Sequence, residues 1–84
     1  MERITMICDM RELNYLELTN IIGFLKMNLG WKGHVNVYTP DEKSPEIKFI
    51  EFRSTIEQYE FIRSKLRKLY GARLLYMKAT KIRV

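Results

Sequence analysis

Residues 46–71, EIKFIEFRSTIEQYEFIRSKLRKLYG, hold the two clearest secondary-structure signals of the chain, one directly after the other. Residues 46–52 are rich in apolar and aromatic side chains and predict a strand. In the next segment, Ser54 and Glu57 match a capping box, which marks the start of a helix, and Gly71 marks its end. The expected apolar stripe of this helix comprises Tyr59, Ile62, Leu66 and Leu69. A strand that leads at once into an amphipathic helix indicates a domain in which helices cover a sheet.

The segment before this stretch predicts a second strand that pairs with the first. Residues 34–39, HVNVYT, alternate between apolar and polar side chains and end at Pro40, as a half-buried strand does. Residues 40–45, PDEKSP, have the composition of a hairpin loop. The two strands are therefore expected to pair antiparallel.

The amino-terminal part has the same order of strand and helix. Residues 3–10 are short, apolar and bounded by charge, which predicts a buried strand. Asn14, followed three residues later by Glu17, predicts the start of a helix, and Gly30 predicts its end. The apolar positions expected in this helix are Leu18, Ile21, Ile22, Leu25 and Leu29.

The chain is strand-like again after the second helix. Residues 73–77 and 81–84 form either one strand or a bent pair, with residues 79–80 as the expected break. The order is then βαββαβ. We therefore predict one α+β domain over residues 1–84, a ferredoxin-like sandwich whose four-stranded antiparallel sheet has both helices on one face.

The other face of that sheet is open and is the expected functional surface. Four apolar side chains are expected to point at the helices: Val35, Val37, Ile50 and Phe52. The residues beside them then point outward: His34, Asn36, Tyr38, Ile47, Phe49 and Glu51. In the last strand, Lys81 and Arg83 join this open face if Ile82 and Val84 lie inside. Aromatic rings and cations on one surface favour single-stranded nucleic acid as the ligand.

Charge is distributed unevenly along the chain. Through Glu60 the sequence contains ten acidic and seven basic residues, and after it eight basic residues and no acidic ones. The eight are Arg63, Lys65, Arg67, Lys68, Arg73, Lys78, Lys81 and Arg83. A basic segment of this kind can hold a polyanion by displacing its counterions. Arg67 and Lys68 have an alternative role, because basic residues near the carboxyl end of a helix also complement its dipole.

The second half of the sequence resembles the RNA-recognition motif. Residues 49–52, FIEF, are similar to the closing half of the longer signature of that family, on its third strand. Residues 68–71, KLYG, resemble the Leu-x-Gly that ends its second helix, and residues 81–84, KIRV, resemble its fourth strand. The resemblance covers residues 47–84, and the first half by topology only. It implies binding of RNA in preference to DNA.

The sequence departs from this family at the residues that stack on bases. The longer signature begins with a basic residue, continues with a glycine, and places aromatic residues third and fifth. Here those positions hold Pro45, Glu46, Ile47 and Phe49. Met6 stands where the shorter signature on the first strand usually has an aromatic residue. The resemblance therefore implies a degenerate member, in which Tyr38 can replace a lost ring if the strand register brings it to the same face.

These observations predict a non-enzymatic nucleic-acid-binding domain. Tyr38 and Phe49 are expected to stack on bases, and Lys81 and Arg83 to contact phosphates near them. The other predicted contacts are cationic: Arg63, Lys65, Arg67, Lys68, Arg73 and Lys78. The alternative is a protein-interaction or homodimerisation module on the same face, because a second copy could cover Met6, Tyr38, Ile47 and Phe49.

Enzymatic chemistry has little support in the sequence, and neither a cofactor nor a metal is predicted. His34 is the only histidine, and the glycines lack the clustered spacing that binds phosphates. Asp9, at the end of the first strand, resembles the aspartate of small CRISPR-associated ferredoxin-like proteins, which can share a metal across a dimer. This resemblance implies a metal-dependent nuclease, but the match is a single residue, and ordinary turn chemistry is the favoured explanation of an aspartate just before a loop.

The predicted compartment is the cytoplasm. Residues 4–8, the apolar part of the amino terminus, are too few for a signal peptide or a membrane span, so no membrane partner is expected. Cys8 has no second cysteine with which to form a disulfide or a zinc site, and we expect it to be a small buried hydrophobic residue.

Overall fold

The computed structural model describes residues 2–30, 34–71 and 74–81, and the side chains within the first two of these ranges. Two helices and the strands of an antiparallel sheet alternate along the chain, as predicted for an α+β domain. The elements are β1 (Glu2–Asp9), α1 (Tyr15–Leu29), β2 (Asn36–Tyr38), β3 (Ile47–Ser54), α2 (Ile56–Tyr70) and β4 (Leu74–Lys81).

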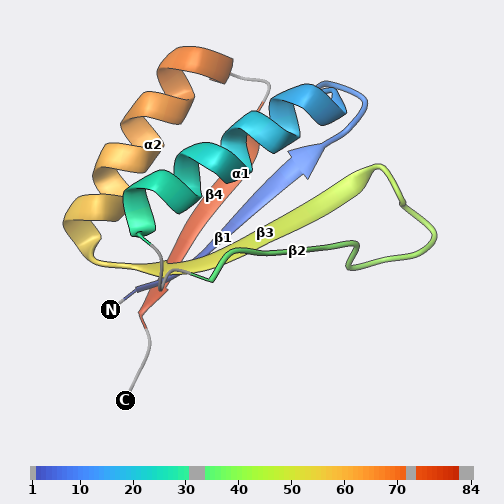
Figure 1. Ribbon diagram of the computed structural model, residues 1–84. Coiled ribbons are helices and arrows are strands. Elements are labelled where there is room, and N and C mark those ends of the chain that lie inside the picture. The colour runs from blue at the N-terminus through green and yellow to red at the C-terminus, as the bar shows by residue number, and fades with distance from the viewer. Residues whose placement is uncertain (1, 31–33, 72–73, 82–84) are drawn as a thin grey trace.

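The sheet is built around β1, which has a neighbour on each side (Figure 1). Strands β2, β3 and β1 form the antiparallel part whose side chains are described, and the backbone of β4 pairs antiparallel with the other edge of β1. The spatial order is β2-β3-β1-β4, which is compatible with a ferredoxin-like fold. The expected hairpin of β2 and β3 is confirmed, because Val37 pairs with Ile50 and Tyr38 with Phe49.

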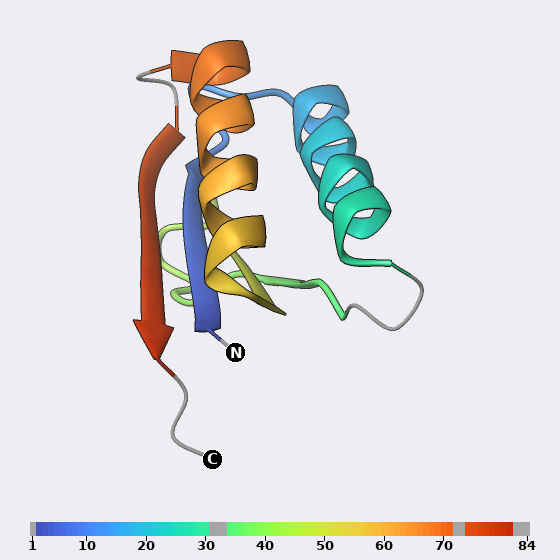
Figure 2. The ribbon, with the colours of Figure 1, turned by 90° about the vertical axis from the view of Figure 1, so that its left-hand side faces the viewer.

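Both helices lie on the same side of the sheet, and the core fills the space between the two layers (Figure 2). The sheet contributes alternate residues, as the period of two in a strand requires. Its buried side chains are Ile4, Met6, Cys8, Ile50 and Phe52. The expectation that Met6 lies on the face opposite the helices was wrong, because Met6 alternates with Thr5 and Ile7 and so points into the core with Ile4 and Cys8. The helices contribute Leu18, Ile21, Leu25, Ile62 and Leu66. The inward positions predicted for Ile50 and Phe52 are therefore confirmed.

Helix α1 begins and ends where the sequence predicts. The side chain of Asn14 accepts a hydrogen bond from the backbone N–H of Glu17 at 2.8 Å, and the Glu17 carboxylate accepts one from the backbone N–H of Asn14 at 3.2 Å. This reciprocal pair satisfies two N–H groups that the first turn leaves without partners. Gly30 ends the helix with a φ of 77°, in the left-handed region that glycine adopts without steric cost.

Helix α2 begins one residue later than the predicted capping box. Thr55 is the N-cap and Gln58 its partner, whereas Ser54 is the last residue of β3, where it pairs with Glu2. The predicted pair of Ser54 and Glu57 was wrong because the sheet holds Ser54 as a buried strand residue.

The apolar stripe of α2 also differs from the prediction at one position. Ile62 and Leu66 are buried and Tyr59 packs against the core, as expected, but Leu69 is 66% exposed. Tyr70 takes its place in the stripe, because it follows Leu66 by four residues and so returns to the same side of the helix.

The two outer strands differ in length from the prediction. Strand β2 covers three residues instead of the expected 34–39. Strand β4 continues through the expected break, since Ala79 pairs with Ile4 and Thr80 with Arg3. The irregularity in this pairing lies between Ile7 and Cys8 of β1 instead. The second segment of the expected bent pair, residues 82–84, lies outside the described residues.

Candidate nucleic-acid interface

The face of the sheet opposite the helices carries a defined set of side chains, which we call the open face. Its described members alternate with the buried residues of β1 and β3 and extend onto β2. They are Arg3, Thr5, Ile7, Asn36, Tyr38, Ile47, Phe49, Glu51 and Arg53. The predicted outward positions of Phe49 and Glu51 follow from this register, because Ile50 and Phe52 are buried on the other side.

An aromatic pair occupies the middle of the open face. The ring centroids of Tyr38 and Phe49 are 5.7 Å apart with an angle of 60° between the ring planes. Their backbones are register partners, and the next residue in the same row is Ile7. The backbone of Tyr76 continues this row as the β4 partner of Ile7. The two rings that the sequence predicted for this face therefore lie side by side.

A polar group lies next to these rings. The Tyr38 hydroxyl donates a hydrogen bond to Oε1 of Glu51 at 2.8 Å, and Nη2 of Arg3 lies 3.4 Å from Oε1 and 3.3 Å from Oε2. The hydrogen bond to the Glu51 carboxylate is the main reason that the pKa of Tyr38 is raised. Glu51 therefore connects the aromatic pair with a cation of β1, and Tyr38 keeps its proton at neutral pH.

Two arginines of the open face lie at the end of the sheet where β1 begins. Arg3 and Arg53 are cross-strand register partners, and both are exposed. Two guanidinium groups on adjacent strands can contact the phosphates of one extended strand of nucleic acid. On the β4 side, the backbone of Lys78 pairs with Thr5, which is also a position of the open face.

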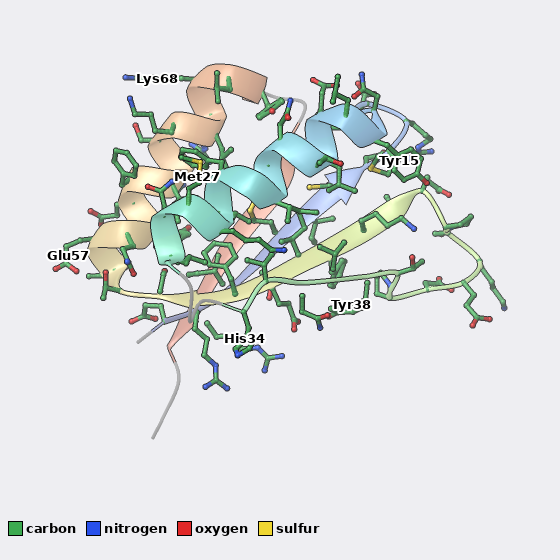
Figure 3. The ribbon with its side chains drawn as sticks, in the orientation of Figure 1. Tyr15, Met27, His34, Tyr38, Glu57 and Lys68 are labelled. Carbon is green, nitrogen blue, oxygen red and sulfur yellow. The ribbon has the colours of Figure 1, made fainter. Side chains whose placement is uncertain are left out.

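The cations predicted on α2 lie in the other layer of the molecule. Arg63, Lys65, Arg67 and Lys68 are all residues of this helix. In Figure 3, Lys68 extends from the helix layer, whereas Tyr38 lies along the sheet. Nζ of Lys65 lies 5.8 Å from the centroid of the Phe61 ring, also on α2. The structure therefore does not bring the α2 cations together with the aromatic pair.

The other predicted cations fall in the last part of the chain. Arg73 and Arg83 lie outside the described residues, and for Lys78 and Lys81 the structure describes the backbone alone. The backbone of Lys81 pairs with Glu2, two residues from the buried Ile4. Lys81 therefore holds a register position on the helix side of the sheet, and the open-face position expected for it was wrong. The lysine of β4 at an open-face register position is Lys78, the partner of Thr5.

Asp9 takes part in a local turn that occupies its carboxylate. Oδ2 accepts a hydrogen bond from Nη2 of Arg11 at 2.7 Å, and Oδ1 accepts from Nε at 3.0 Å and from the Arg11 backbone N–H at 2.9 Å. These bonds lower the pKa of Asp9. Within the described ranges, no group of three or more histidine, cysteine, aspartate or glutamate residues could hold a metal ion. The Asp9 carboxylate is thus held by the side chain and the backbone of Arg11.

The other residues considered for chemistry in the sequence are His34 and Cys8. His34 is exposed and precedes β2. Cys8 is fully buried in the core, as predicted, and burial raises the pKa of its thiol to about 11. A thiol with such a pKa is inert at neutral pH.

Sequence reasoning missed the two arginines and the hydrogen-bonded role of Glu51. Arg53 could have been found, because it continues the alternation of Phe49 and Glu51 along β3. Arg3 could not, since its place beside Glu51 depends on the register between β1 and β3.

Neither helix in the described part of the chain is long and apolar enough to cross a membrane.

No model of a known protein family matches this sequence, and no curated protein is significantly similar to it.

Proposed function

We propose that this chain is a non-enzymatic nucleic-acid-binding domain that holds single-stranded RNA, or DNA with lower preference, on the open face of its sheet. The observation that supports this most directly is the aromatic pair of Tyr38 and Phe49 on a face that no helix covers. Bases stack on such rings with a gain of about 1–3 kcal/mol each, whatever their sequence.

The charges around the pair suit a strand that crosses the sheet. Arg3 and Arg53 lie together at one end of the open face, where they can neutralise phosphates on that side of a stacked base. The cations of α2 lie in the other layer, so they extend the positive field of the molecule and contact different nucleotides from those on the rings. In this proposal the domain is a degenerate relative of the RNA-recognition motif that works in the cytoplasm.

The test is fluorescence anisotropy with labelled single-stranded RNA and DNA oligomers, titrated at low and near-physiological salt. We expect Phe49→Ala to weaken binding by about 5- to 100-fold, because it removes one stacking ring. The matched control is Tyr15→Ala, which removes an aromatic ring that is 69% exposed on α1. It should leave the affinity unchanged. Circular dichroism of both variants verifies that they are folded.

The alternative function is a protein-interaction or homodimerisation module on the same face. The half-buried Ile7 and Ile47 beside Phe49 favour it, because apolar side chains on a sheet face can pack against a second copy. In that case Phe49→Ala shifts the sedimentation of the protein toward a monomer, and the wild-type protein binds no RNA or DNA oligonucleotide even at low salt. Binding that disappears with salt and does not depend on Phe49 would contradict the proposed stacking and leave only a nonspecific electrostatic surface.

A further inference from the structure

Glu51 is a carboxylate in the middle of a surface that we propose for binding a polyanion. Its side chain is 20% exposed, and it lies on β3 two residues after Phe49, on the same face. A negative charge at this place opposes phosphates, so a role in phosphate binding does not explain it. Its geometry suits the edge of a base instead.

The carboxylate has hydrogen-bonding capacity left after its contacts within the protein. An ionised carboxylate has two oxygens with about four acceptor sites. One site on Oε1 accepts the short bond from Tyr38, and the two contacts from Arg3 are long, at 3.3 and 3.4 Å. Oε2 therefore has no short hydrogen bond from either of these residues. The Tyr38 hydroxyl fixes the carboxylate beside the ring, so the acceptor is already in position before a ligand binds.

The position of this acceptor relative to the rings decides which part of a base it meets. The Tyr38 ring contacts Phe49, while its hydroxyl contacts Glu51. A base that stacks on either ring lies with its flat face against that ring. Its hydrogen-bonding edge then points sideways, in the plane of the base. On the Glu51 side, that edge meets a carboxylate that can only accept hydrogen bonds.

We propose that Glu51 selects guanine among the bases that stack on Tyr38 and Phe49, an inference that rests on the proposed function. Guanine presents two adjacent N–H donors, at N1 and N2, on its Watson–Crick edge, and these match the two oxygens of a carboxylate. Adenine and cytosine place an unprotonated ring nitrogen beside their amino group, and uracil places a carbonyl on each side of its single N–H. These acceptors repel the carboxylate. Guanine is therefore the one base that can form a bidentate pair with Glu51.

The experiment compares the pentanucleotides UUGUU, UUAUU and UUIUU, in which inosine lacks the 2-amino group of guanine. We expect the wild-type protein to bind UUGUU about 5- to 10-fold more tightly than UUAUU, with UUIUU between them, because one bidentate contact to a base edge discriminates by at least that factor. Glu51→Gln replaces one acceptor with a donor at the same size and should remove this preference. It should not weaken binding of UUAUU, because it also removes a negative charge.

The matched control is Glu60→Gln, which removes the same charge from an exposed position on α2 and should retain the guanine preference. Equal binding of the three oligomers by the wild type would overturn the role of Glu51 while leaving the nucleic-acid interface intact. A guanine preference that persists in Glu51→Gln would overturn it as well. If the wild type binds none of the oligomers, the proposed function itself fails, and the inference fails with it.

Discussion

At the scale of single residues, the carboxylates of this chain differ by their partners. Asp9 accepts hydrogen bonds from the guanidinium and the backbone of Arg11, two residues further along. Glu51 instead accepts from residues of two other strands, Arg3 and Tyr38. The first arrangement closes a turn, and the second lies on a surface that a ligand can reach. Similar side chains thus serve a local structural role and a proposed recognition role.

The turn at Asp9 should make stability depend on pH. Because its partner lowers the pKa of Asp9 in the folded state, the stabilisation is present above the usual aspartate pKa of 3.8 and is lost as the pH falls through the lower folded pKa. Arg11→Met removes the guanidinium and keeps an apolar stem. We expect it to lower the urea midpoint at pH 7 and to match the wild type more closely near the acid end. The control Arg53→Met should not approach the wild type in this way at acid pH. If the urea midpoints of Arg11→Met and the wild type differ by the same amount at every pH, the proposed role of the pair is contradicted.

At the scale of elements, the start of α2 shows what a local pattern can predict. Both Ser54 with Glu57 and Thr55 with Gln58 fit a capping box, so the sequence contains two overlapping solutions. The pairing of Ser54 with Glu2, a contact between residues far apart in sequence, decides for the second. Asn14 has no such competitor, and there the prediction was correct.

The assignment of the N-cap can be tested by substitution. Thr55→Ala should lower the free energy of unfolding by about 1 kcal/mol, because it leaves the backbone N–H of Gln58 without its partner at 3.1 Å. Urea denaturation measures the change. Ser64→Ala, at an exposed position inside α2, is the matched control and should be neutral or slightly stabilising. A Thr55→Ala variant as stable as this control would show that the cap contributes nothing.

The same distinction separates the predictable part of the candidate site from the rest. The alternation of β2 and β3, together with the short loop between them, was enough to place Tyr38 and Phe49 on one face. The link from Glu51 to Arg3 needed the register of β1, which no local pattern encodes. Likewise, the charge distribution alone did not separate the α2 cations from the open face, whereas the predicted placement of both helices on the other face did.

At the scale of the whole molecule, the two layers separate the aromatic pair from the α2 cations. A short oligomer on the open face should therefore be insensitive to α2, while a longer one can reach both layers. We expect the triple variant Lys65→Gln, Arg67→Gln, Lys68→Gln to bind a strand of about five nucleotides as the wild type does and one of about thirty more weakly, with a shallower salt dependence. Anisotropy over a salt series measures both. An equal loss for the two lengths would contradict the separation.

The central place of β1 in the sheet also has a consequence for how the chain folds. Met6 pairs with Ile50 on one side and with Met77 on the other, so both partners of this early strand are made long after it. Closing such distant contacts is slow, because the entropy of the intervening loops is lost before the pairing is gained. A nascent chain on the ribosome therefore carries β1 with two unpaired edges until β3 emerges. Its second edge stays open until β4 follows, and during that interval it can pair with other chains.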